Sequence, residues 1–258
     1  MKIIAITNQK GGVGKTTTAT ALAAGLQMQG FRTLLVDTDP QGNASDTYGL
    51  DEDRPTVYDV FTGAVTAQEA IQHTAQGDLL PGDIQMSAAD MTFTRQGREF
   101  ILREALSPIA AQYDYLILDT PPALGVTTIN ALTAADSLIV PVLADRYSLK
   151  GINQLTDTIE TVQKYSNPRL RIEGILLTRY NARMILSRDV RFTIEQMAES
   201  WNTKVFKTTI RQSVTIPESQ TQQESIFHYA PDSTTGQDYA AFIEEFLKGE
   251  RKDGKERF

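Results

Sequence analysis

The stretch that decides the fold is Lys10-Gly11-Gly12-Val13-Gly14-Lys15-Thr16-Thr17. It follows a short apolar run at 3–7 and precedes a helical pattern of Ala, Leu and Met at 17–29. A glycine-rich turn between a strand and a helix that ends in Gly-Lys-Thr is typical of a phosphate-binding loop. We expect backbone N–H groups from Gly11 to Thr17, aided by the helix N-terminus, to hold phosphate oxygens.

Two side chains of this loop carry further predictions. Lys15 is expected to bridge the β- and γ-phosphates of a nucleoside triphosphate, and Thr16 to offer its hydroxyl to Mg²⁺. The simpler alternative is a glycine turn that only joins a strand to a helix. The Gly-Lys-Thr ending after a predicted strand argues against that alternative.

Apolar runs alternate with helical patterns along the rest of the chain. This alternation is typical of a parallel sheet covered on both faces, and it predicts a doubly wound, mostly parallel α/β fold in one domain, 1–248. We expect 51–86 to be irregular, with short helical pieces on the rim, and 249–258 to be a charged, flexible tail. Further strands are predicted at 32–37, 113–119, 137–142 and 172–178, and helices at 127–135, 149–165, 188–201 and 239–248.

Composition limits the possible functions. The chain has 258 residues, a formal net charge of −7 and no cysteine. The missing cysteines exclude a disulfide scaffold, a thiolate metal site and a cysteine nucleophile. Any nucleic-acid contact must come from a local basic patch, because the protein as a whole is acidic. No run approaches the roughly 18 apolar residues that a membrane span requires, so we expect a soluble cytoplasmic protein.

Three carboxylates follow two of the predicted strands. Asp37 and Asp39 lie in the segment DTDPQGNA, and Asp119 precedes Thr-Pro-Pro. Ligands of open α/β sheets bind beyond the carboxyl ends of the strands, so these acids are expected to converge on the phosphate loop. A carboxylate after a run of buried aliphatic residues needs a cation, and Mg²⁺ supplies one. Each acid alone could instead be a helix cap or turn residue.

The loop departs from the ordinary pattern because Lys10 holds the place of its first glycine. In this it resembles the deviant Walker A group, which comprises bacterial partition ATPases (ParA/Soj type) and septum-site regulators (MinD type). The resemblance implies that Lys10 reaches across a homodimer, formed with ATP and Mg²⁺, to the partner's phosphates. It assigns the positioning of the attacking water to Asp39, and metal binding to Asp37 and Asp119. A solvated Lys10 beside the loop is the alternative.

The same resemblance places the adenine ring against Asn181, which follows the last predicted strand, and against Pro217. A basic segment in this region is a candidate DNA surface, since phosphate-directed cations bind duplex DNA without reading its sequence. Seven basic residues stand there against three acidic ones; a solvated helix face is the alternative. The seven are Arg179, Arg183, Arg188, Arg191, Lys204, Lys207 and Arg211.

The resemblance to the short, Soj-like partition ATPases implies a cycle of ATP-driven dimerisation, non-specific DNA binding and release by hydrolysis. A centromere-binding ParB-like protein is the implied partner, and the nucleoid the implied location. We expect slow hydrolysis without that partner, because no catalytic arginine or glutamine is evident. Two alternatives stay open: a membrane-associated MinD-like positioning ATPase and a cofactor-assembly ATPase of the same superfamily.

Overall fold

The centre of the molecule is a seven-stranded sheet in the order β3-β4-β2-β5-β1-β6-β7. The computed structural model describes residues 1–145 and 148–255. Every neighbouring pair of strands is parallel except β3 and β4, which confirms the predicted fold class. The strands are β1 Lys2–Ile6, β2 Thr33–Asp37, β3 Gln72–Thr74, β4 Gly77–Leu80, β5 Tyr115–Asp119, β6 Ser137–Leu143 and β7 Arg171–Thr178.

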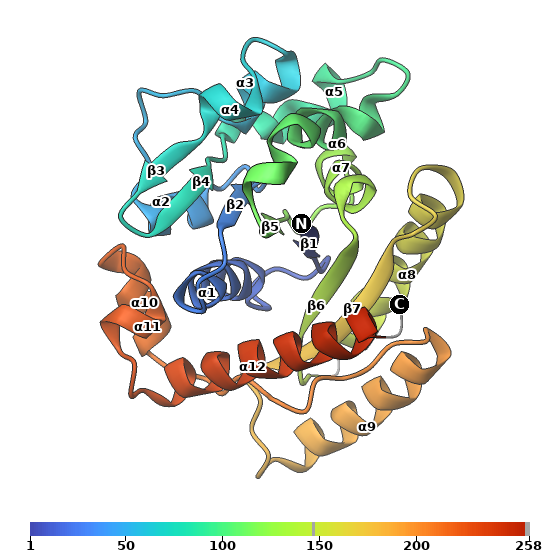
Figure 1. Cartoon of the computed structure of the whole chain (residues 1–258). Helices are drawn as coiled ribbons and strands as arrows, with labels where there is room; N and C mark the ends of the chain where they lie inside the picture. Colours follow the sequence, from blue (N-terminus) through green and yellow to red (C-terminus); the bar gives the residue numbers. More distant parts are fainter. Residues whose placement is uncertain (146–147, 256–258) are drawn as a thin grey trace.

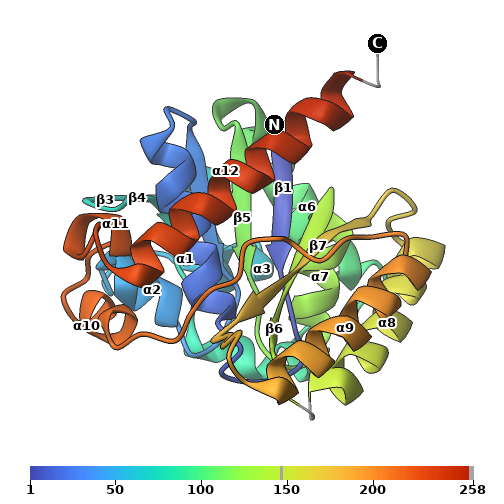
Figure 2. The same ribbon diagram turned by 90° about the horizontal axis from the view of Figure 1, so that it is seen from below.

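Helices cover both faces of the sheet (Figures 1 and 2). The α-helices are α1 Lys15–Met28, α2 Asn43–Tyr48, α3 Val57–Thr62, α4 Ala67–Ala70, α5 Ala89–Thr92, α6 Ile101–Leu106, α7 Val126–Ala134, α8 Ser148–Tyr165, α9 Ile185–Ser200, α10 Thr215–Thr221, α11 Ile226–Tyr229 and α12 Thr234–Lys255. Three 3₁₀ helices are η1 Ile84–Ala88, η2 Arg98–Phe100 and η3 Ser107–Gln112.

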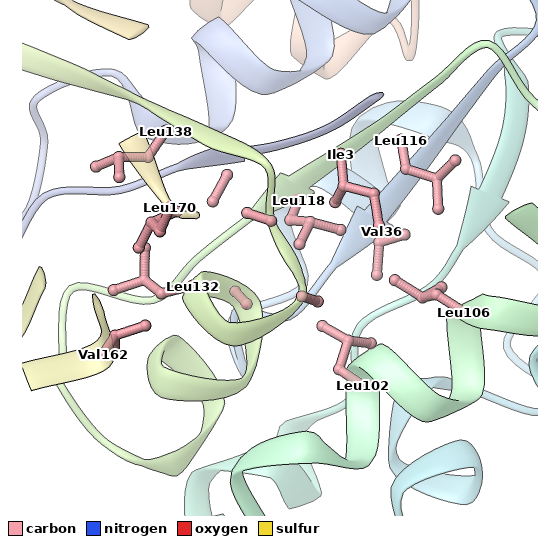
Figure 3. Close-up of a cluster of buried hydrophobic side chains, with 14 of the residues drawn as sticks. Ile3, Val36, Leu102, Leu106, Leu116, Leu118, Leu132, Leu138, Val162 and Leu170 are labelled. Atoms are coloured by element: carbon pink, nitrogen blue, oxygen red, sulfur yellow. The ribbon is translucent and has the colours of Figure 1, made fainter. Parts of the chain in front are cut away.

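The apolar side chains of the strands form two cores, one on each face, because successive side chains of a strand point in opposite directions. On β1, Ile3 joins Leu102 of α6 and Leu132 of α7 in one core (Figure 3). Its neighbour Ile4 joins the other core with residues of α1 and α12, including Phe242. This two-sided burial explains why the strand sequences are continuously apolar rather than alternating.

Two segments differ from the sequence-based expectation. The segment 51–86, expected to be irregular, contains the β3–β4 hairpin, which extends the sheet beyond β2. Strand β3 is short and polar, and only pairing with β4 holds it extended. Helix α12 begins at Thr234 and continues to Lys255, beyond the boundary expected at Lys248; residues 256–258 lie outside the described part.

Four loops leave the carboxyl ends of the parallel strands on the same edge of the sheet. The loops after β1, β2 and β7 carry the phosphate loop, Asp39 and Arg179 respectively, and Asp119 is the last residue of β5, where the fourth loop begins. Two hydrogen bonds join the ends of β2 and β5: the N–H and the hydroxyl of Thr38 both donate to the carbonyl of Asp119, at 3.0 and 2.6 Å. Sheet topology therefore brings the predicted site residues together.

Candidate nucleotide-binding site

The loop between β1 and α1 has the backbone that a phosphate cradle requires. Gly12 and Gly14 have φ values of 72° and 86°, a region that side chains with a Cβ rarely adopt. Gly14 also lies against Thr178, whose hydroxyl donates to the Val13 carbonyl at 2.8 Å. Helix α1 begins at Lys15 without a side-chain cap, so its first N–H groups are available for an anion.

Lys15 is held inside this cradle. The residue is only 6% exposed, and its Nζ lies 3.4 Å from the carbonyl of Lys10. Burial lowers the pKa of Lys15 from its ordinary value, while the charges of Asp119 and Asp39 raise it. The ammonium group thus lies in a pocket with acids nearby and no ion-pair partner within 4 Å in the described residues. A phosphate group would supply the missing anion.

Of the three acids, Asp119 carries the largest electrostatic cost. It is fully buried at the end of β5, and neither carboxylate oxygen has a hydrogen-bond partner among the described residues. Burial, followed by the charge of Asp37, raises the pKa of Asp119 well above its ordinary value; the Thr16 hydroxyl and Lys15 act in the opposite direction. A buried carboxylate without partners fits a cation site, as expected for Mg²⁺.

Asp37 lies beneath the site rather than in its lining. Its carboxylate accepts three hydrogen bonds, from the Asp39 N–H at 3.0 Å and from the N–H and hydroxyl of Ser45 at 2.9 and 2.7 Å. Burial is the main reason that the pKa of Asp37 is raised to about 6. The structure thus gives Asp37 a role in holding the loop, and any contact with a metal would have to share oxygens that are already engaged.

No described group of three or more acidic, histidine or cysteine side chains is placed to hold a metal alone. This agrees with the chemistry of Mg²⁺ at nucleotide sites, where one or two protein groups act together with phosphates and water. Thr16 and Asp119 are the protein groups that fit. Asp39 is 6% exposed and lines the cavity above them.

A cavity of about 650 Å³ opens over the phosphate loop. Residues from Gly11 to Thr17 form its floor, and Asp39 and Pro122 line its side. Pro217 lines it as expected, but Asn181 does not: Asn181 is exposed, and its side chain accepts the Arg183 N–H at 3.0 Å. The remaining wall comes from Gln41, Asn43, Thr178, Arg179, Ile210, Arg211, Gln212, Ser213, Ile216, Gln220, Thr235 and Tyr239.

Sequence reasoning missed most of that wall. Thr235 and Tyr239 reach the cavity because α12 begins five residues earlier than its apolar pattern indicates, in a polar turn. Tyr239 is fixed there by a hydrogen bond of 3.2 Å between its hydroxyl and that of Thr18. The signal in the sequence was weak, since a tyrosine in an apolar helix stripe indicates only core packing.

Lys10 does not line this cavity. Its Nζ lies 2.5 Å from Oδ2 of Asp145 and 3.5 Å from Oγ of Ser148, at the start of α8. The other Asp145 oxygen accepts the Ser148 N–H at 2.9 Å and so caps α8. Hydrogen bonds from Lys10 and Ser148 outweigh the effect of burial and lower the pKa of Asp145. Within a single chain, Lys10 therefore neutralises an acid beside the nucleotide cavity instead of a phosphate.

The seven candidate DNA-binding residues differ in their local surroundings. Arg179 and Arg211 line the nucleotide cavity, and Arg211 is clamped by Asp238 through contacts of 2.6–3.2 Å. Lys204 lies 3.7 Å from Glu173, and Arg191 pairs with Glu195 along α9 at 2.8 Å. Among the described residues, four of the seven are exposed without an ion-pair partner: Arg179, which lines the nucleotide cavity, and Arg183, Arg188 and Lys207, which do not.

Comparison with known proteins bears on this geometry. A family model described as "AAA domain" matches residues 1–172. The sporulation initiation inhibitor protein Soj of Bacillus subtilis is 42% identical over 95% of this chain and 97% of its own length. The chromosome partitioning protein ParA of Myxococcus xanthus is 40% identical over 96% of this chain and 88% of its own length. The chain belongs to the Soj/ParA family.

A solved structure gives the same fold. Cobyrinic acid a,c-diamide synthase from Mycobacterium smegmatis, with bound ADP and magnesium, superposes with a TM-score of 0.84 at 34% identity, covering 97% of this chain and 96% of that one. Family membership confirms the resemblance inferred from Lys10 and the phosphate loop. Among the described residues, no helix is long and apolar enough to cross a membrane.

Proposed function

We propose that this chain is a DNA-partitioning ATPase that acts as a nucleotide-switched dimer. ATP with Mg²⁺ closes two copies face to face, the dimer binds duplex DNA without sequence preference, and hydrolysis releases it. The observation that carries the proposal is that one loop holds two lysines in different environments. Lys15 lines the nucleotide cavity of its own chain, whereas Lys10 lies outside that cavity.

The phosphate loop supports the nucleotide-binding part of this proposal. Residues from Gly11 to Thr17 would hold the phosphates, with the ammonium of Lys15 against the terminal ones. Mg²⁺ held by Thr16 and Asp119 would neutralise charge on the phosphates. Asp39 lines the same cavity and would orient the attacking water. Pro217 would contact the base, and Arg179, which lines the cavity where Asn181 does not, would be its second neighbour.

The dimer follows from Lys10. Its side chain is 28% exposed in the loop after β1, and its ammonium group pairs with Asp145. A partner's triphosphate carries more negative charge than one aspartate, so a second copy docked against this loop would draw Lys10 from Asp145 to the partner's phosphates. Each copy would then complete the other's site, and dimerisation would depend on ATP.

The DNA surface follows from the unpaired cations. Arg183 and Arg188 lie near the start of α9, on the chain that leaves β7 next to the nucleotide cavity. A dimer doubles such a cationic patch, so DNA affinity would rise with the dimer population, a linkage between nucleotide and DNA sites. We place the main DNA contacts at these residues and at Lys207, and remove Arg211 because Asp238 already holds it.

A ParB-like centromere-binding partner would stimulate hydrolysis, and the dimer would reside on the nucleoid. The Soj and ParA names of the relatives support this assignment. The name of the synthase neighbour supports a second candidate, an ATP-dependent enzyme of cofactor biosynthesis. Such an enzyme would turn over ATP independently of duplex DNA and would need a small acid substrate.

Light scattering and phosphate release, measured with ATP, ADP or no nucleotide, test the proposal. Wild-type protein should be a dimer only with ATP and Mg²⁺. Lys10→Ala should bind ATP but stay monomeric, while Lys164→Ala, an exposed lysine on α8, serves as the matched control. Asp39→Ala should form a dimer that does not release phosphate. Wild-type-like dimers of Lys10→Ala would overturn the shared-site model.

A further inference from the structure

Ser45 lies in α2, outside the nucleotide cavity, and its hydroxyl is fully engaged. The residue is 1% exposed. Its hydroxyl donates to Oδ2 of Asp37 at 2.7 Å and accepts the N–H of Gly82 at 2.8 Å. Its own N–H donates to the same Asp37 oxygen at 2.9 Å. Ser45 therefore joins three segments: the end of β2, the start of α2 and the loop after β4.

The other oxygen of Asp37 connects this junction to the residue expected to place the water. Oδ1 of Asp37 accepts the backbone N–H of Asp39 at 3.0 Å. On its far side Asp39 is held by its own turn, where its side chain accepts the Gln41 N–H and its carbonyl accepts the Gly42 N–H, both at 3.0 Å. The position of Asp39 thus depends on Asp37, and that of Asp37 on Ser45.

Gly82 leaves no free space around the same two acids. A Cβ at this position would lie 3.0 Å from Cγ of Asp37 and 3.0 Å from the carbonyl oxygen of Asp39, closer than such contacts normally occur. The backbone of Gly82 does not adopt the left-handed region, so the constraint is steric rather than conformational. The loop after β4 therefore packs directly against the segment that carries Asp39.

We propose that Ser45 is a positioning residue for ATP hydrolysis, which holds Asp39 in place through Asp37, with Gly82 as the fixed support behind it. The inference rests on the ATPase function proposed above. Ser45 and Gly82 touch neither the cavity nor its phosphate-binding residues. Their loss should therefore affect the step that requires Asp39 and leave nucleotide binding in place. Small displacements of a reacting group cost ~10- to 100-fold in rate.

The test compares Ser45→Ala and Gly82→Ala with Thr47→Ala. Thr47 is a matched control: it lies in the same helix, is 5% exposed, and its hydroxyl donates only to the Asn43 carbonyl, at 2.8 Å. Single-turnover and steady-state hydrolysis are measured together with ATP affinity and thermal unfolding. Ser45→Ala keeps its backbone bond to Asp37, so we expect it to fold.

The expected result is a fall in kcat of about tenfold or more for Ser45→Ala and Gly82→Ala, with little change in ATP affinity or KM. Thr47→Ala should match wild type in kcat. Ser45→Ala with wild-type kcat, or with kcat and ATP affinity reduced together, would overturn the positioning role. If wild-type protein itself released no phosphate, the proposed ATPase function would fail, and this outcome is distinct from a failure of Ser45.

Discussion

Replacing Asp119 with asparagine is expected to stabilise the nucleotide-free protein while removing its response to magnesium. Asp119 is fully buried, and both of its oxygens lack hydrogen-bond partners in the described structure. Burial and the charge of Asp37 disfavour its negative charge more than the Thr16 hydroxyl and Lys15 favour it. Leaving a buried polar group unpaired costs about 1–3 kcal/mol, and more for a charged one. An uncharged amide of the same shape keeps the cost of an unpaired polar group but removes the extra cost of the charge, so the variant should gain about 1 kcal/mol or more near neutral pH.

The assay is thermal unfolding without nucleotide and then with ATP and Mg²⁺. In a chain of this length, 1 kcal/mol shifts Tm by roughly 2–4 °C, so Asp119→Asn should unfold several degrees above wild type in the empty state. Adding ATP and Mg²⁺ should raise the Tm of wild type through linked binding, and should raise that of the variant far less. Stability and function are thus expected to change in opposite directions.

The pH dependence provides an internal check. The pKa of Asp119 is raised, so acidification protonates the wild-type carboxyl in the folded state and removes the penalty. The gap in Tm between variant and wild type should therefore narrow as the pH falls. Asp114→Asn is the control: Asp114 pairs with Arg32 on the surface, which lowers its pKa to about 2, so this variant should gain no stability. A lower Tm for empty Asp119→Asn than for empty wild type near neutral pH would refute the reasoning.

Three further predictions follow from the same site. Asp145→Asn keeps an oxygen for the cap of α8 but removes the negative charge that holds Lys10, so this variant should form dimers at a lower ATP concentration, measured by light scattering. Unchanged dimerisation would show that Asp145 does not restrain Lys10. Arg183→Ala with Arg188→Ala should weaken DNA binding and reduce its salt dependence with ATP affinity intact, whereas Arg191→Ala, already paired, should do little. Burial raises the pKa of Asp37 to about 6, so its contribution to the free energy of unfolding should be largest at low pH and fade as the pH rises through about 6; Asp37→Asn should flatten that part of the profile.

The sequence predicted the fold well where residues are buried on both sides. Five of the seven strands, β1, β2, β5, β6 and β7, lie in largely apolar runs, and the helices between them carry clear periodicity. The β3–β4 hairpin escaped detection because β3 is only Gln72–Thr74, with one buried side chain. Its strand conformation comes from pairing, which a local pattern does not record.

The phosphate-loop part of the site could be predicted equally well from the sequence, since Lys15, Thr16 and Asp39 lie where the order of the motifs places them. The opposite wall of the cavity could not be predicted, because its residues come from the loops around 179 and 210–213 and from α10 and α12, far along the chain. Arg211 shows what a count of charges cannot record: its tight pairing with Asp238 depends on helix packing. The same holds for Asp37, whose hydrogen bond with Ser45 is evident only in the folded structure.

Binding of the purified protein to non-specific duplex DNA tests the central claim most directly. It is measured with ATP, with ADP and without nucleotide, each over a series of salt concentrations, with anionic lipid vesicles as a second surface. The account predicts tight, salt-sensitive DNA binding with ATP only, and none to vesicles. DNA binding indifferent to nucleotide, or absent in every state, would contradict it; vesicle binding with ATP would identify a membrane-positioning ATPase instead.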